Sequence, residues 1–172
     1  QLDKYVLVEV KALNSAVSSA VSQFSASTAV VTEAPVNVTP PLTSVRDNPG
    51  ANGTPRYFEG ATSSLMSVSD GAWTGTAPRT NSYQWFHCTQ SHPVITDFIT
   101  LTDDCEFIDG ETDNTHRLTS ADVEMYVGAV VTATNSLGAS SVASATSSVV
   151  NATPVATVEP FIEGDPIAGS TL

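Results

Sequence analysis

Cys88 and Cys105 are the only cysteines of the chain, and seventeen positions separate them across a predicted hairpin. In an oxidising compartment a bond between them would close a short loop and stabilise the fold by about 3 kcal/mol. The alternative is a pair of free thiols. A zinc site is not expected, because no further Cys or His pair with zinc-ligand spacing accompanies them. The pair therefore favours a structural disulfide outside the cell.

Six carboxylates follow closely on one another around Cys105. They are Asp103, Asp104, Glu106, Asp109, Glu111 and Asp113. Clustered oxygens of this kind can hold a hard cation such as calcium. No EF-hand or glycine-aspartate repeat is present, however, and alternate residues of a strand face opposite sides. The run is interpreted as a solvated acidic edge, with calcium binding as the alternative.

The three histidines give no catalytic pattern. His87, His92 and His116 lack helical metal-ligand spacing, and no serine lies in a Gly-x-Ser-x-Gly turn. Phosphate-binding loops and dinucleotide motifs are also missing from the sequence. We therefore expect neither an enzyme nor a bound cofactor.

The charge of the chain bears on its partners. Six basic residues stand against eighteen acidic ones, which gives a net charge of −12. Such a charge repels phosphate backbones and anionic lipid. No run of eighteen apolar residues occurs in the sequence. Nucleic acid is not expected as a partner, nor is membrane insertion of this segment.

An internal repeat determines how the chain is organised. Residues 5–15 and 126–136 share Tyr, Val, Ala, Asn and Ser at an offset of 121 positions. Val30-Val31 recurs as Val149-Val150 at an offset of 119, so a small deletion separates the two parts of the repeat. A period of roughly 120 residues predicts a tandem array of modules.

The repeat divides the chain into three parts. Residues 1–34 are predicted to be the C-terminal strands of a preceding module, residues 35–153 one complete module, and residues 154–172 the start of a following one. Proline-bearing joints at the equivalent places 34–41 and 152–160 predict a semi-rigid, elongated array.

The residue patterns predict an all-β fold. β-branched and aromatic runs between turn-forming residues mark strands at 5–10, 64–68, 82–87, 106–108, 126–134 and 139–150. Residues 135–138 are predicted to form the hairpin turn into the last strand. A helix over 16–29 is the alternative for an Ala- and Ser-rich stretch, but that stretch aligns with the strand at 139–150.

Two aromatic residues are predicted to lie in the core. Trp85 is in the middle of a strand, where an indole fills the space between two sheets of an immunoglobulin-type sandwich. Tyr126 opens a later strand, in the place of a corner tyrosine. Both residues are expected in an immunoglobulin-type sandwich.

Further motifs extend this pattern along residues 35–153. They are Gly71-Ala-Trp73-Thr-Gly75, Tyr83-Gln-Trp85, the pair Cys88 and Cys105, Ile108-Asp-Gly110, Leu118-Thr-Ser-Ala-Asp122-Val-Glu124 and Val131-Thr-Ala-Thr-Asn135. Together they resemble the immunoglobulin-like modules that occur in tandem in large secreted and surface proteins of bacteria, especially actinobacteria. The chain departs from that pattern at Glu124, where glycine is usual, and in a longer insert between the cysteines.

The resemblance implies a structural repeat of an extracellular or cell-surface fibre, stalk or filament, with a mechanical and adhesive role. Its partners would be neighbouring modules of the same chain and lateral copies in a filament. The alternative is a recognition module that binds a cell-surface glycan or protein through the loop 46–56 and the insert 89–104. Phe98 and Ile99 in that insert are the candidate binding residues.

Overall fold

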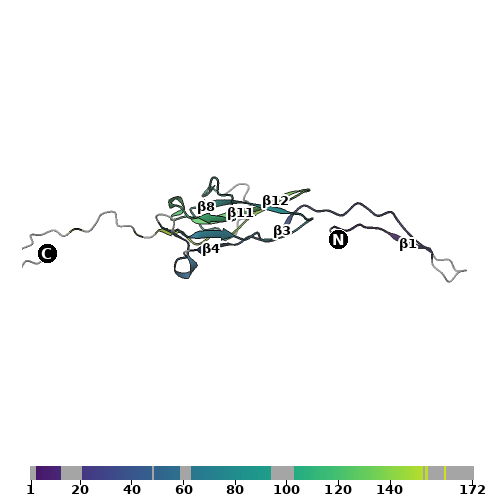
Figure 1. Cartoon of the computed structure of the whole chain (residues 1–172), viewed down its shortest axis with the longest axis horizontal. Coiled ribbons are helices and arrows are strands. Elements are labelled where there is room, and N and C mark those ends of the chain that lie inside the picture. Colours follow the sequence, from purple (N-terminus) through teal and green to yellow (C-terminus); the bar gives the residue numbers. More distant parts are fainter. Residues whose placement is uncertain are drawn as a thin grey trace, which may run out of the picture.

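The computed structural model describes residues 3–12, 21–47, 49–58, 63–93, 103–152, 154 and 161. These residues form an all-β fold with two short 3-10 helices, η1 (Ala51–Gly53) and η2 (Ser120–Asp122). The central part contains two antiparallel sheets and is flanked by a two-stranded hairpin (Figure 1).

The first sheet has the strand order β10-β6-β4 and the second the order β12-β11-β8-β9. The strands of the first are β4 (Thr43–Asp47), β6 (Leu65–Val68) and β10 (Thr115–Arg117). Those of the second are β8 (Thr80–Cys88), β9 (Cys105–Phe107), β11 (Tyr126–Asn135) and β12 (Gly138–Ala143). Short pairs join β3 (Val36–Thr39) to β7 (Ala72–Thr74) and β5 (Arg56–Tyr57) to β13 (Asn151–Ala152).

The two sheets enclose one main core. Met66 and Val68 of β6 pack in the same buried cluster as Trp85 of β8 and Val127 of β11. Trp85 is completely buried, and its indole N–H donates a 2.9 Å hydrogen bond to the backbone carbonyl of Asp113. A buried indole needs such a partner, so this bond allows the largest side chain of the core to occupy the space between the sheets.

Strand β11 is the centre of the second sheet. It pairs with β8 on one side and β12 on the other. Its Val127, Ala129, Val131 and Ala133 alternate along the strand and are all fully buried. Gly128 and Val130 on the opposite face are buried as well, Val130 in a second cluster with Phe86, Cys88 and Ala143, so the middle of β11 is covered on both faces and is not half-buried as the alternation predicted.

The hairpin turn lies where the sequence predicts it. Asn135 and Gly138 are paired across a two-residue loop, and the Asn135 side chain accepts a 2.9 Å bond from the Leu137 amide. Gly138 has a φ of 150°, a conformation that side chains disfavour.

The last predicted strand is shorter than expected, because β12 ends at Ala143. Beyond it, serine side chains replace backbone carbonyls as acceptors. Ala129 N–H donates to Ser144 Oγ at 3.0 Å and Val127 N–H to Ser147 Oγ at 3.1 Å. The residues after β12 therefore remain hydrogen-bonded to β11, although they do not form a regular strand. The sequence prediction also omitted the short strands β3, β4, β5, β7, β10 and β13.

A second hairpin precedes the central part. β1 (Glu9–Ala12) pairs only with β2 (Val21–Phe24) within the described chain, and backbone bonds extend the pairing to Asp3 and Val31. Every residue described at 3–12 and 22–33 is exposed. Figure 1 shows this ribbon reaching outward beyond β3 and β12.

Candidate functional site

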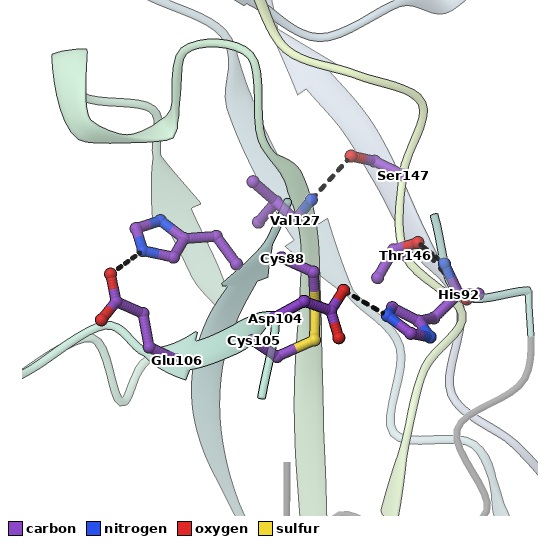
Figure 2. The surroundings of a disulfide bond; sticks show 9 residues. Cys88, His92, Asp104, Cys105, Glu106, Val127, Thr146 and Ser147 are labelled. Carbon is purple, nitrogen blue, oxygen red and sulfur yellow. Dashed lines mark hydrogen bonds and ion pairs between the residues drawn. A yellow bond between two sulfur atoms is a disulfide. The ribbon is translucent and has the colours of Figure 1, made fainter. Parts of the chain in front are cut away.

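The predicted disulfide is present. Cys88 ends β8 and Cys105 begins β9, and the two residues are direct partners in the antiparallel register. Cys88 is completely buried beside β11, whereas Cys105 is partly exposed. The bond therefore fixes β9 to the end of β8, where the insert between the two strands begins and ends (Figure 2).

A polar cluster adjoins the disulfide (Figure 2). His92 Nε2 and Asp104 Oδ2 lie 2.8 Å apart, so the two ends of the insert are joined. The His92 amide donates a 2.8 Å bond to Thr146 Oγ1, and the Thr146 amide returns one of 2.9 Å to the His92 carbonyl. The base of the insert is thereby attached to the segment after β12.

Four potential metal ligands meet at this point. Donor atoms of Cys88, His92, Asp104 and Cys105 lie within 4.8 Å of one another. His92 and Asp104 were not predicted to accompany the cysteines. A metal is bound by the thiolate form of cysteine, however, and here both sulfurs are in the disulfide. The oxidised cluster is a structural one.

Removing the disulfide tests this structural role. The double substitution Cys88→Ser with Cys105→Ser is expected to lower the free energy of unfolding by about 3 kcal/mol, because the unfolded chain loses a closed loop. Urea unfolding followed by tryptophan fluorescence measures the change. The unsubstituted chain with added reductant should give the same value, and a change below about 0.5 kcal/mol would contradict the assignment.

A second polar cluster crosses the interior. Asp122, at the end of η2, lies between two histidines, with Oδ1 3.1 Å from His87 Nδ1 and Oδ2 3.1 Å from His116 Nε2. The outer ring nitrogens meet Glu106 and Glu111, each at 3.0 Å. Five titratable side chains thus form one continuous chain of contacts.

Asp122 is completely buried, so its charge must be compensated locally. Burial alone would raise the pKa of its carboxyl. Hydrogen bonds from His116, the Thr119 amide and His87 outweigh burial and lower that pKa from 3.8 to about 2. The carboxylate therefore stays ionised in the core.

His116 is buried against Trp85, with ring centroids 5.5 Å apart. Burial alone would lower the pKa of its imidazole. The hydrogen bonds to Asp122 and Glu111 have the greater effect and raise the pKa above 6.5. The protonated ring is thus favoured between two carboxylates.

These shifts predict how stability depends on pH. The contribution of protonated His116 is fully present below pH 6.5 and is lost as the pH rises through its higher folded-state pKa. The contribution of Asp122 is present above pH 3.8 and is lost as the pH falls toward about 2, a loss of about 2 kcal/mol. Urea unfolding across this range should show maximal stability between about pH 4 and 6.5.

The variant His116→Gln tests whether His116 causes the loss of stability at higher pH. It is expected to be less stable at pH 5 and to show a smaller fall in stability above pH 6.5. An unchanged slope above that pH in the variant would show that another group titrates there.

The acidic run is divided in the structure. Asp103, Asp104 and Glu106 line an open cavity of about 370 Å³ together with His87, Thr89, Cys105 and Met125. Glu111 instead contacts His116, and the backbone of Asp113 binds Trp85. The acidic run was predicted to be a solvated edge. In the structure, part of it lines a cavity beside the disulfide.

The remaining predicted site residues are placed as follows. Tyr126, which was predicted to lie in the core, is only half-buried at the start of β11, opposite Cys88. Phe98 and Ile99 lie outside the described residues. The contact chain through His87, His116 and Asp122 was not predicted as a unit.

Comparison of the chain with models of known protein families, with curated proteins and with solved structures gave no match. Among the described residues, none of the helices has the length and apolar character needed to span a bilayer.

Proposed function

We propose that the chain is a structural repeat of an extracellular bacterial fibre, stalk or filament, built from tandem immunoglobulin-like modules, with a mechanical and adhesive role and no enzymatic activity. One observation carries the proposal. The N-terminal hairpin has the same pairing and hydrogen bonding as the β11–β12 hairpin at the equivalent positions of the repeat.

The strand register supports this equivalence. Glu9 pairs with Phe24 in the first hairpin, and Val130 pairs with Ala143 in the second. The sequence offsets of 121 and 119 convert the first pair into the second. A slip of one residue would turn every side chain to the other face, so an identical register is a demanding criterion.

Bonds outside the regular strands agree as well. The Ser25 amide donates to the Val8 carbonyl at 2.8 Å, and Ser25 Oγ accepts from the Val8 amide at 3.0 Å. At the equivalent positions, Ser144 and Ala129 make the same two bonds, at 2.8 and 3.0 Å. In both hairpins, therefore, a serine hydroxyl takes the place of a backbone acceptor, with the same hydrogen-bond distances.

The agreement extends to the ends of both hairpins. Asp3 has a φ of 58° and its amide donates to Val31; Glu124 has a φ of 66° and its amide donates to Val150. Positive φ is uncommon outside glycine. Its recurrence at equivalent positions supports two copies of one module.

The sheets support an immunoglobulin-like architecture. The orders β10-β6-β4 and β12-β11-β8-β9 correspond to two antiparallel sheets of such a sandwich, with Trp85 on the strand that carries the core tryptophan. The disulfide supports an extracellular location, because such bonds persist in oxidising compartments.

Electron microscopy of the native material tests the proposal, together with denaturing electrophoresis with and without reductant. We expect fibres with a regular axial repeat and a polypeptide far above 17.9 kDa. Discrete globular particles of the segment's own mass, without fibres, would overturn it.

A recognition module is the second candidate. The cavity of about 370 Å³ at the base of the insert favours it, because Thr89, Asp103 and Asp104 of the insert line that cavity. Its acidic lining suits a basic protein segment or the hydroxyl groups of a glycan. Binding to a glycan array, abolished by Asp103→Asn with Glu106→Gln, would support this candidate.

A further inference from the structure

One face of β1 and the residues before it is apolar and exposed. Val6, Val8 and Val10 are 38%, 58% and 62% exposed, and Ala12 is exposed beside them. An isolated two-stranded hairpin is only marginally stable in water. This ribbon therefore lacks the surfaces that would bury it.

The equivalent residues of the second hairpin show what those surfaces are. Val6, Val8, Val10 and Ala12 correspond to Val127, Ala129, Val131 and Ala133, which are all fully buried. The edge of β11 away from β12 is occupied along nine residue pairs by β8, from Tyr126 opposite Cys88 to Thr134 opposite Thr80. The corresponding edge of β1 has no partner among the described residues.

We propose that the free edge of β1 binds a strand of the β8 type from a second copy of the repeat. This inference rests on the proposed tandem architecture, since it uses the equivalence of the two hairpins. The register of β11 with β8 then places Val6 opposite the position of His87, Val8 opposite that of Trp85, and Val10 opposite that of Tyr83. Backbone bonds supply affinity in such strand addition, and alternate side chains supply specificity.

A single position sets the specificity of this edge. Gly128 lies opposite Phe86, and a Cβ added to Gly128 would lie 2.3 Å from the Phe86 ring. The hairpin has Leu7 where β11 has Gly128. A strand that pairs with β1 must therefore carry a smaller residue than phenylalanine opposite Leu7. The hairpin therefore fits a strand from another copy of the repeat and excludes β8 of the central part, which carries Phe86.

A labelled peptide provides the test. The probe has the sequence of residues 79–89 with Cys88→Ser and Phe86→Ala, and fluorescence anisotropy measures its binding to the full chain. We expect saturable binding that weakens at least about tenfold when Val8→Lys places a charge on the apolar face. The peptide that keeps Phe86 should bind about tenfold more weakly than the probe, because Leu7 fills the space that the ring needs.

Two controls make the result specific. Val38→Lys changes a valine that is 62% exposed on β3, outside the hairpin, and should leave binding unchanged. Val6→Cys in the chain should cross-link to a probe with His87→Cys and not to one with Ser82→Cys, which would require another register.

The inference is overturned if the probe does not bind, if Val8→Lys leaves binding unchanged, or if both cysteine probes cross-link equally. It is also overturned if the chain forms a dimer through β1 that the probe does not displace, because the occupant would then be a second β1 edge. The outcome is separable from the proposed function. Fibres without probe binding contradict only this inference, and probe binding without fibres contradicts only the function.

Discussion

The substitution Asp122→Ala is expected to lower the free energy of unfolding by about 3–5 kcal/mol, because it breaks a buried ionic network and leaves its other members uncompensated. The carboxylate accepts bonds from the Thr119 amide at 2.7 Å and from Thr119 Oγ1 at 2.9 Å, besides its contacts with two histidines. All of these donors lose their acceptor at once. Urea unfolding at pH 5.5, followed by tryptophan fluorescence, measures the effect.

Two further variants serve as comparisons for Asp122→Ala. Asp122→Asn keeps the shape and one acceptor oxygen, so a smaller loss of about 1–3 kcal/mol is expected. Asp109→Asn removes an exposed carboxylate and should change the stability by less than about 0.5 kcal/mol. If Asp122→Ala behaved like Asp109→Asn, the network would have no structural role.

The second large effect is expected from Trp85→Ala, which should lower the free energy of unfolding by about 3–5 kcal/mol. The substitution leaves a cavity between the sheets, since the indole is completely buried in the main core. It also leaves the Asp113 carbonyl without its 2.9 Å donor and the His116 ring without its tilted aromatic contact. Domains of this size are stable by only about 5–15 kcal/mol, so the variant should be partly unfolded at moderate temperature.

The other tryptophan is the matched control. Trp73 is only partly buried, although its indole N–H likewise donates to a backbone carbonyl, that of Asp70, at 2.7 Å. Trp73→Ala should therefore cost less than half as much as Trp85→Ala. Thermal unfolding followed by circular dichroism compares the two variants, and equal losses would show that burial between the sheets is not what makes Trp85 important.

Local patterns were sufficient to predict the all-β class and the longest strands. The strand over 126–134 and the turn at 135–138 are encoded by consecutive residues, and the structure contains both, although β11 is buried on both faces over residues 127–131 rather than on one. The disulfide was predictable for a similar reason, because two cysteines flank a hairpin. The short strands β5 and β13 were not predicted, since two residues give no periodicity and their pairing depends on the rest of the fold.

The buried network shows the limit of sequence reasoning more clearly. His87 and His116 lie on strands of different sheets, and only the packing of these sheets brings both to Asp122. One signal was available. Thr119 followed three residues later by Asp122 is a capping-box pattern, and the structure shows the corresponding bond from the Thr119 amide. Reading it would have singled out Asp122 as structural, but not its histidine partners.

The positions of β3 and β13 determine how the central part responds to tension. The chain enters through β3 at one end and leaves through β13 at the opposite end (Figure 1). A pull along the long axis therefore runs parallel to both strands, each of which is paired to a strand of the body, β7 and β5. Bonds loaded in shear must break together, whereas bonds that are unzipped break one after another. Under the proposed mechanical role, the short terminal pairs would therefore act as clamps that protect the core from a stretching force.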